Sequence, residues 1–257
     1  MKAIQQKKSN FLEWNNLVLT SSIKKIDINI FLVIILDALF YLLSGYLVIF
    51  WLQRIQAKLA GFNLPSDVTA IGVEKTQQLV REAKAFYFLL IFSFLLLLIA
   101  IIFLASILKG IIWAKTTKTK ISFGLISKFL GLNLIWMSFW FAAVFLVSWL
   151  AEPAMTPILM VIVIILGLYF TNTLYTIFMK EQKISSIIGA VKIGIKKAHL
   201  FLLPYSVILL LFFVIVSLVR FVNTGYSQIL AGLAIIAYFA AVRYYASDLA
   251  LEAEKAS

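Results

Sequence analysis

The sequence predicts an all-α membrane protein in which six transmembrane helices form three hairpins, with basic amphipathic helices at the membrane interface before helices one, three and five. Hydrophobic residues make up 63% of the 257-residue chain and charged residues only 13%, a balance well beyond that of soluble domains. Six apolar runs are each long enough to cross a bilayer as a helix, which takes about 20 residues. The runs lack the alternation of membrane barrel strands, so helices are expected.

The six runs cover residues 28–52, 85–108, 129–150, 158–179, 200–219 and 226–246. Pro153 and Pro157 break the chain between runs three and four, and Asn223 and Gly225 supply turn residues between runs five and six. Both pairs are therefore expected to form close hairpins. The runs leave no interval for a separate soluble domain, so residues 1–257 are predicted to be a single integral membrane domain.

The chain contains signs of an internal threefold repeat, with repeat-like segments at residues 12–115, 119–180 and 183–250. Lys120 and Lys183 each open a Lys-Ile-Ser sequence just before a basic stretch that leads into an apolar run. The first repeat carries an insertion at residues 53–84. Either the second spanning helix projects beyond the bilayer here, or the insertion caps the bundle and binds a protein partner.

The distribution of Lys and Arg predicts the orientation of the chain. Of the 23 Lys and Arg residues, only six lie in the segments that directly follow the first, third and fifth runs. They are Arg54, Lys58, Lys75, Arg81, Lys84 and Arg220. The other 17 lie on the opposite side. Under the positive-inside rule both termini are cytoplasmic, and the predicted location is the cell membrane with multiple passes.

The basic segments have one apolar and one polar face. In residues 183–199, Ile184, Ile188 and Ile195 recur at helical spacing opposite Lys192 and Lys196. Such helices are expected to lie at the interface and bind anionic lipid headgroups. The candidate headgroup contacts are Lys120, Lys128, Lys192, Lys196 and Lys197. Nucleic acid binding is not expected, because the cations are spread over loops without exposed aromatic platforms.

Three polar residues inside the runs are candidate site residues: Asp37, Asn172 and Arg243. Asp37 lies roughly 13 Å along its helix from Ile28, where a charge costs a few kcal/mol. Arg243 is on the same side of the membrane, which suggests that the two pair. The pair either packs the bundle or lines an ion or proton path. Asn172 is expected to hydrogen-bond across helices, and Gly45, Gly167 and Gly232 to permit close helix contacts.

No catalytic or metal site can be assembled from this sequence. The chain has no Cys and one His, and it lacks the nucleotide-binding, hydrolase and metalloprotease motifs. Asp248 and Glu252 share a helix face near the end of the chain and are expected to be a solvated helix end. We therefore expect neither an enzyme nor a cofactor.

The segment Lys183-Ile184-Ser185-Ser186-Ile187-Ile188-Gly189-Ala190, running into an apolar helix of a six-helix chain, resembles the multi-pass membrane domain of some glycerophosphoryl diester phosphodiesterases. It also resembles related stand-alone prokaryotic membrane proteins of unknown function. In that family the hydrolase chemistry belongs to a separate soluble domain, so no catalytic residue carries over. The resemblance implies a prokaryotic inner-membrane protein.

The preferred prediction is a non-enzymatic accessory or lipid-interacting factor. The alternative is a small transporter or permease subunit with a polar path near Asp37. A water-accessible cavity that reaches Asp37 would favour transport, whereas a closed bundle with lateral grooves would favour the accessory role.

Overall fold

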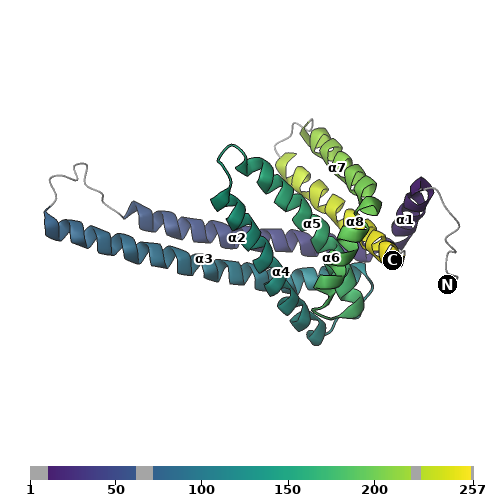
Figure 1. The fold of residues 1–257 in the computed structure, drawn as a ribbon, viewed down its shortest axis with the longest axis horizontal. Coiled ribbons are helices and arrows are strands. Elements are labelled where there is room, and N and C mark those ends of the chain that lie inside the picture. Colours follow the sequence, from purple (N-terminus) through teal and green to yellow (C-terminus); the bar gives the residue numbers. More distant parts are fainter. Residues whose placement is uncertain (1–10, 62–71, 221–226, 256–257) are drawn as a thin grey trace. The chain divides into compact units, whose positions relative to one another are not determined.

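The computed structural model describes residues 11–61, 72–220 and 227–255, in which the regular structure is entirely helical (Figure 1). Six helices are long and apolar enough to cross a membrane. They are α2 (Asn29–Ala60), α3 (Val73–Thr116), α4 (Phe123–Leu150), α5 (Thr156–Glu181), α7 (Ala198–Arg220) and α8 (Ser227–Lys255). Two shorter helices, α1 (Phe11–Lys25) and α6 (Ser186–Lys196), precede α2 and α7. The predicted six-helix membrane fold is confirmed.

The chain divides into two compact units. The larger unit comprises residues 1–38 and 106–257, and the smaller unit comprises residues 39–105. Helices α2 and α3 each contribute to both. Asn223 and residues 62–71 of the insertion lie outside the described residues.

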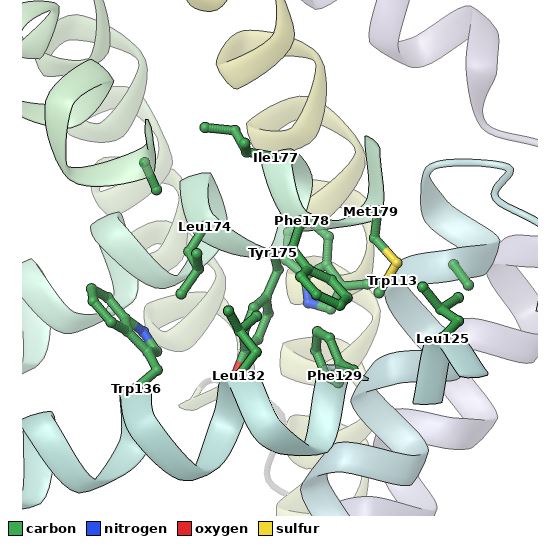
Figure 2. Close-up of a cluster of buried hydrophobic side chains, with 12 residues drawn as sticks. Trp113, Leu125, Phe129, Leu132, Trp136, Leu174, Tyr175, Ile177, Phe178 and Met179 are labelled. Carbon is green, nitrogen blue, oxygen red and sulfur yellow. The ribbon is translucent and has the colours of Figure 1, made fainter. Parts of the chain in front are cut away.

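The core of the larger unit is formed where the end of α3 meets α4, α5 and α6. Figure 2 shows Trp113, Phe129 and Tyr175 gathered there, with the Phe129 and Tyr175 ring centroids 4.8 Å apart. Phe129, Leu132, Leu174 and Phe178 are fully buried. Because these side chains come from helices on both sides of the turn at residues 117–122, this cluster fixes the second hairpin against the end of α3.

Helix α8 is packed along its second half. Leu249, Ala250 and Ala253 are completely buried in a cluster with Val18 of α1 and Phe201 of α7. Small side chains on this face let neighbouring helices approach. The expectation of a solvated helix end is therefore wrong for this face of α8, whereas Glu252 is half-buried and pairs with the exposed Lys255 of the same helix.

Two of the acidic residues at this end of α8 are held by Lys residues of other helices. Asp248 is only 5% exposed, and one of its carboxylate oxygens lies 2.6 Å from Lys25 Nζ of α1. Glu254 lies 2.7 Å from Lys180 Nζ of α5. The run of small residues and acids, read as a polar tail in the sequence, is a docking face for α1 and α5.

The basic segments before helices three and five fold differently from each other. Helix α6 is separate and packs on α5 through a face of small residues, Ser186, Ala190 and Gly194. Residues 123–130 instead form the first turns of α4. The Ser122 hydroxyl accepts the Leu125 N–H at 3.1 Å and caps α4; no break follows, so this segment is continuous with its spanning helix.

In the smaller unit, the described parts of α2 and α3 lie side by side. Trp51 Nε1 donates to Ser93 Oγ at 3.0 Å, and the Trp51 ring packs on Phe94 at 5.8 Å between centroids. Helix α3 begins at Val73 and runs unbroken through the polar stretch into the apolar one. Its polar part, residues 73–84, adds roughly 18 Å of helix to the apolar run.

The glycines that pack most tightly are not those expected. A Cβ added to Gly45 or Gly232 would meet no atom within 4 Å, so neither permits a close contact. Gly167 does pack against the Trp140 ring, at 3.5 Å. The closest approaches are at Gly194, where a Cβ would lie 2.6 Å from Phe170 Cε1, and at Gly110, where it would lie 2.9 Å from Ile126 Cδ1.

Candidate functional site

The predicted pair of Asp37 and Arg243 is present in the larger unit. Arg243 Nη1 donates to Asp37 Oδ2 at 2.8 Å, and Nη2 donates to Oδ1 at 3.2 Å. Asp37 is 1% exposed and Arg243 9%. This fork geometry uses both carboxylate oxygens and joins α2 to α8 across the unit.

A second cation completes the site. Lys109 Nζ of α3 lies 2.5 Å from Asp37 Oδ1, so one carboxylate accepts from two cations on different helices. We call Asp37, Lys109 and Arg243 the ion cluster. In the sequence, Lys109 is one of the 17 cations on the predicted cytoplasmic side. The position of Lys109 in the sequence could have revealed its role. Lys109 directly follows the second apolar run, and in a hairpin the end of the second run lies beside the start of the first run.

The ion cluster adjoins a buried chain of aromatic and polar groups. The Arg243 guanidinium lies 5.8 Å from the centre of the Trp113 ring, within range of a cation–π contact. Trp113 packs edge-on against Tyr175, with ring centroids 5.6 Å apart. The chain then continues as hydrogen bonds, because Tyr175 OH donates to Asn133 Oδ1 at 2.6 Å and Asn133 Nδ2 donates to Ser106 Oγ at 3.0 Å.

These contacts tie five helices together inside the larger unit: α2, α3, α4, α5 and α8. Each polar atom named in them has a partner at hydrogen-bond distance, which is the condition for burying such groups in a membrane protein. Buried ionic and polar contacts thus connect these five helices.

Asn172 takes part in a separate contact. Its Nδ2 donates to Tyr205 OH at 3.4 Å and so joins α5 to α7. The cross-helix hydrogen bond expected for this residue is therefore present, at the long end of the range. The hydrogen bond of Asn172 is to Tyr205, and the ion cluster is formed by contacts among other residues. The structure therefore does not bring Asn172 together with Asp37 and Arg243 through these contacts.

The lysines predicted to meet lipid headgroups lie in the larger unit, in the turn before α4, in the first turns of α4, within α6 and directly after α6. Lys120, Lys128, Lys192 and Lys196 are exposed and Lys197 is half-buried. We call these five residues the basic rim. Large apolar side chains stand beside them in the sequence and are also exposed: Phe123 at 89%, Ile188 at 73% and Ile195 at 66%. Exposed apolar groups next to exposed cations are typical of a surface that meets the headgroup zone.

Asp27 marks the start of the first spanning helix. Its Oδ1 accepts the Asn29 backbone N–H at 3.1 Å and the Asn29 Nδ2 at 3.0 Å, and Lys118 Nζ lies 3.2 Å from its other oxygen. The Asn29 side-chain hydrogen bond is the main reason that the pKa of Asp27 is lowered from its ordinary value, with a smaller contribution from Lys118. A charged Asp27 at this helix N-terminus is also favoured by the helix dipole.

Neither of the two hollows described on the surface reaches the ion cluster. One is an apolar groove along α7 lined by Leu209, Leu210 and Phe213, and the other lies in the smaller unit. Among the described residues, no three His, Cys, Asp or Glu side chains gather where they could hold a metal ion.

Comparison with protein-family models, with curated proteins and with solved structures finds no match for this chain. Its function is therefore inferred from the geometry of its own residues. Six apolar helices make it an integral membrane protein.

Proposed function

We propose that this chain is a non-enzymatic accessory protein of a prokaryotic inner membrane that binds anionic phospholipid through its basic rim. In this proposal both termini and the rim face the cytoplasm, as the positive-inside rule predicts. The proposal includes kinship with the membrane domain of glycerophosphoryl diester phosphodiesterases, in which the hydrolase chemistry resides on another domain.

The observation that carries the proposal is the pairing of exposed cations with exposed apolar side chains on α6. Ile188, Lys192, Ile195 and Lys196 share the side of α6 that does not pack on α5. The apolar groups suit the acyl boundary and the ammonium groups suit phosphate, each cation being worth about 1 kcal/mol near an anionic surface.

The ion cluster supports an accessory role over transport. Asp37 is almost fully buried and binds two cations. A carboxylate that carries an ion or a proton has to be reached by water, whereas this one is enclosed by Arg243 and Lys109. We assign the ion cluster to holding α2, α3 and α8 together.

The test is a comparison of lipid binding by variants with equal loss of charge. The full chain is purified in detergent, mixed with phosphatidylglycerol or phosphatidylcholine, and analysed by native mass spectrometry. The rim variant Lys120→Gln/Lys192→Gln/Lys196→Gln is expected to lose affinity for phosphatidylglycerol by roughly a hundredfold, since three contacts of about 1 kcal/mol are removed. Binding of phosphatidylcholine is expected to change little.

The matched control is Lys75→Gln/Arg81→Gln/Lys84→Gln, which neutralises three exposed cations of α3 in the smaller unit. It should retain phosphatidylglycerol. The proposal fails if the rim variant retains phosphatidylglycerol as tightly as the unmodified chain, or if the control loses as much of it as the rim variant.

A further inference from the structure

The smaller unit has a groove of about 780 Å³ between α2 and α3. Trp51 and Ile55 of α2 and Phe86 and Leu89 of α3 line its apolar part. Ile55 is 7% exposed, and Trp51 is fixed by its hydrogen bond to Ser93. The groove thus has an apolar floor with a defined shape.

Three charged side chains line the same groove: Arg54 and Lys58 of α2 and Glu82 of α3. Arg54 and Lys58 are one helical turn apart and so share a face. All three are exposed, and among the residues that the structure describes none of them forms a salt bridge. Arg54 lies over the Phe50 ring at 5.1 Å, and Glu82 accepts from Gln78 Nε2 at 2.9 Å.

The groove lies at the level where α3 changes from polar to apolar. The polar part of α3 ends at Lys84 and the apolar run begins at Ala85, so Glu82 and Leu89 flank this boundary. Boundaries of this kind meet the headgroup zone of a bilayer. The charged part of the groove is therefore at headgroup depth and its floor at acyl-chain depth.

We propose that this groove binds a membrane phospholipid whose headgroup carries both a phosphate and an ammonium group. Arg54 and Lys58 bind the phosphate, Glu82 binds the ammonium group, and an acyl chain lies along Trp51 and Leu89. The medium around spanning helices is lipid, which makes an amphiphile the occupant that fits both parts of the groove. A headgroup with negative charge alone would be repelled by Glu82.

This site is independent of the basic rim. It is formed by other helices, it lies on the side of the membrane predicted to be outside, and it differs in charge because it contains a carboxylate. The rim proposal and the groove proposal can each fail alone.

The test uses the quenching of Trp51 fluorescence by lipids with brominated acyl chains. The full chain in detergent is titrated with brominated phosphatidylethanolamine or brominated phosphatidylglycerol, and the Trp51 contribution is obtained by subtracting the signal of Trp51→Phe. Phosphatidylethanolamine is expected to quench Trp51 at lower concentration. Glu82→Gln should weaken phosphatidylethanolamine binding and strengthen phosphatidylglycerol binding, which lowers the preference by about threefold for one exposed ion pair.

The double variant Arg54→Gln/Lys58→Gln should weaken both lipids by about tenfold, because it removes two exposed contacts to phosphate. Matched controls are Glu74→Gln and Lys75→Gln/Lys84→Gln, which remove exposed charges of α3 outside the groove and should leave both titrations unchanged. Circular dichroism spectra of all variants establish that they are folded.

Two outcomes overturn the proposal. One is that neither lipid quenches Trp51, as when a protein segment occupies the groove. The other is that the preference between the two lipids is unchanged in Glu82→Gln. The rim variant described above should quench like the unmodified chain, so a failure here is distinct from a failure of the rim proposal.

Discussion

The carboxylate of Asp37 binds two cations that come from different helices. Burying any charge at membrane depth is costly, and the cost is offset here because both oxygens of Asp37 accept charge-assisted hydrogen bonds. The cluster carries one more positive than negative charge, and the Trp113 ring beside Arg243 lies where it can stabilise part of that excess.

Asp37→Asn is expected to lower the free energy of unfolding by about 3 to 5 kcal/mol, because Arg243 and Lys109 would stay buried without a counter-charge. Thermal unfolding of the purified chain in detergent, followed by circular dichroism, measures the effect. The control is Asp27→Asn, which removes a carboxylate that is also ion-paired but is partly exposed, and which should cost about 1 kcal/mol or less.

The double variant Asp37→Asn/Arg243→Met tests whether the loss arises from an unpaired charge. It should be more stable than the sum of the two single changes implies, since it removes both members of the pair. Strict additivity of the two losses would contradict the assignment.

The pairing of Asp37 with Arg243 could be predicted from the sequence because few other ionisable groups lie at that depth. The role of Lys109 could not, because a Lys at the end of an apolar run is equally suited to lipid phosphate or to an internal partner. The choice depends on the rotation of α3 about its own axis, which apolar periodicity does not define when a run is apolar on every face.

At the level of elements, α6 shows why an amphipathic pattern was only partly informative. Spacing of Ile and Lys correctly predicted a helix. The predicted separation of an apolar face from a basic face is not found, because Ile188 and Ile195 share one side of α6 with Lys192 and Lys196. The side that packs on α5, however, is the row of small residues Ser186, Ala190 and Gly194. Close packing through small residues is a main source of helix association in membranes, and it leaves Ile188 and Ile195 exposed.

Gly194→Ala is expected to destabilise the docking of α6 on α5 by about 1 to 3 kcal/mol, the usual cost of overpacking. The added Cβ would lie 2.6 Å from Phe170 Cε1. The neighbouring residue Tyr169 is constrained, because its OH donates to the Gly194 carbonyl at 2.7 Å and its ring packs on Phe201 and Tyr205. Hydrogen exchange of the α6 amides, read by mass spectrometry, should speed up.

Gly232→Ala is the matched control, since nothing lies within 4 Å of the added Cβ. It should stabilise α8 slightly or leave it unchanged, because Ala favours helix by up to about 1 kcal/mol over Gly. Equal exchange rates for α6 in the two variants would show that the contact with Phe170 relaxes without cost.

For the whole molecule, hydropathy and turn residues were enough to predict six spanning helices. Apolar runs of this length have no other stable form in lipid, so their number follows from the chain itself. The limits of the helices do not, since α3 and α4 begin well before their apolar runs. What the pattern did not reveal was the buried state of Asp248, because a charge near a helix end is solvated or paired according to which helices approach it. In this fold α1 supplies Lys25 and α5 supplies Lys180 for Glu254.

The absence of Cys makes the predicted orientation directly testable by labelling of single introduced thiols. Lys75→Cys and Glu152→Cys should react with a membrane-impermeant maleimide in intact cells, because both follow odd-numbered spanning helices. Lys120→Cys should react only after the cells are permeabilised. All three positions are exposed in the structure, so the reverse labelling pattern would show that the chain inserts the other way round.

The ion cluster also dictates an order of events during biosynthesis. Asp37 enters the membrane 72 residues before Lys109 and 206 residues before Arg243. At ordinary elongation rates, Arg243 is made about 10 to 40 s after Asp37. Lys109 is made about 4 to 14 s after Asp37 and is then a counter-ion within reach, so the first hairpin can hold Asp37 in a neutral pair while the ribosome completes the helix that finally encloses it.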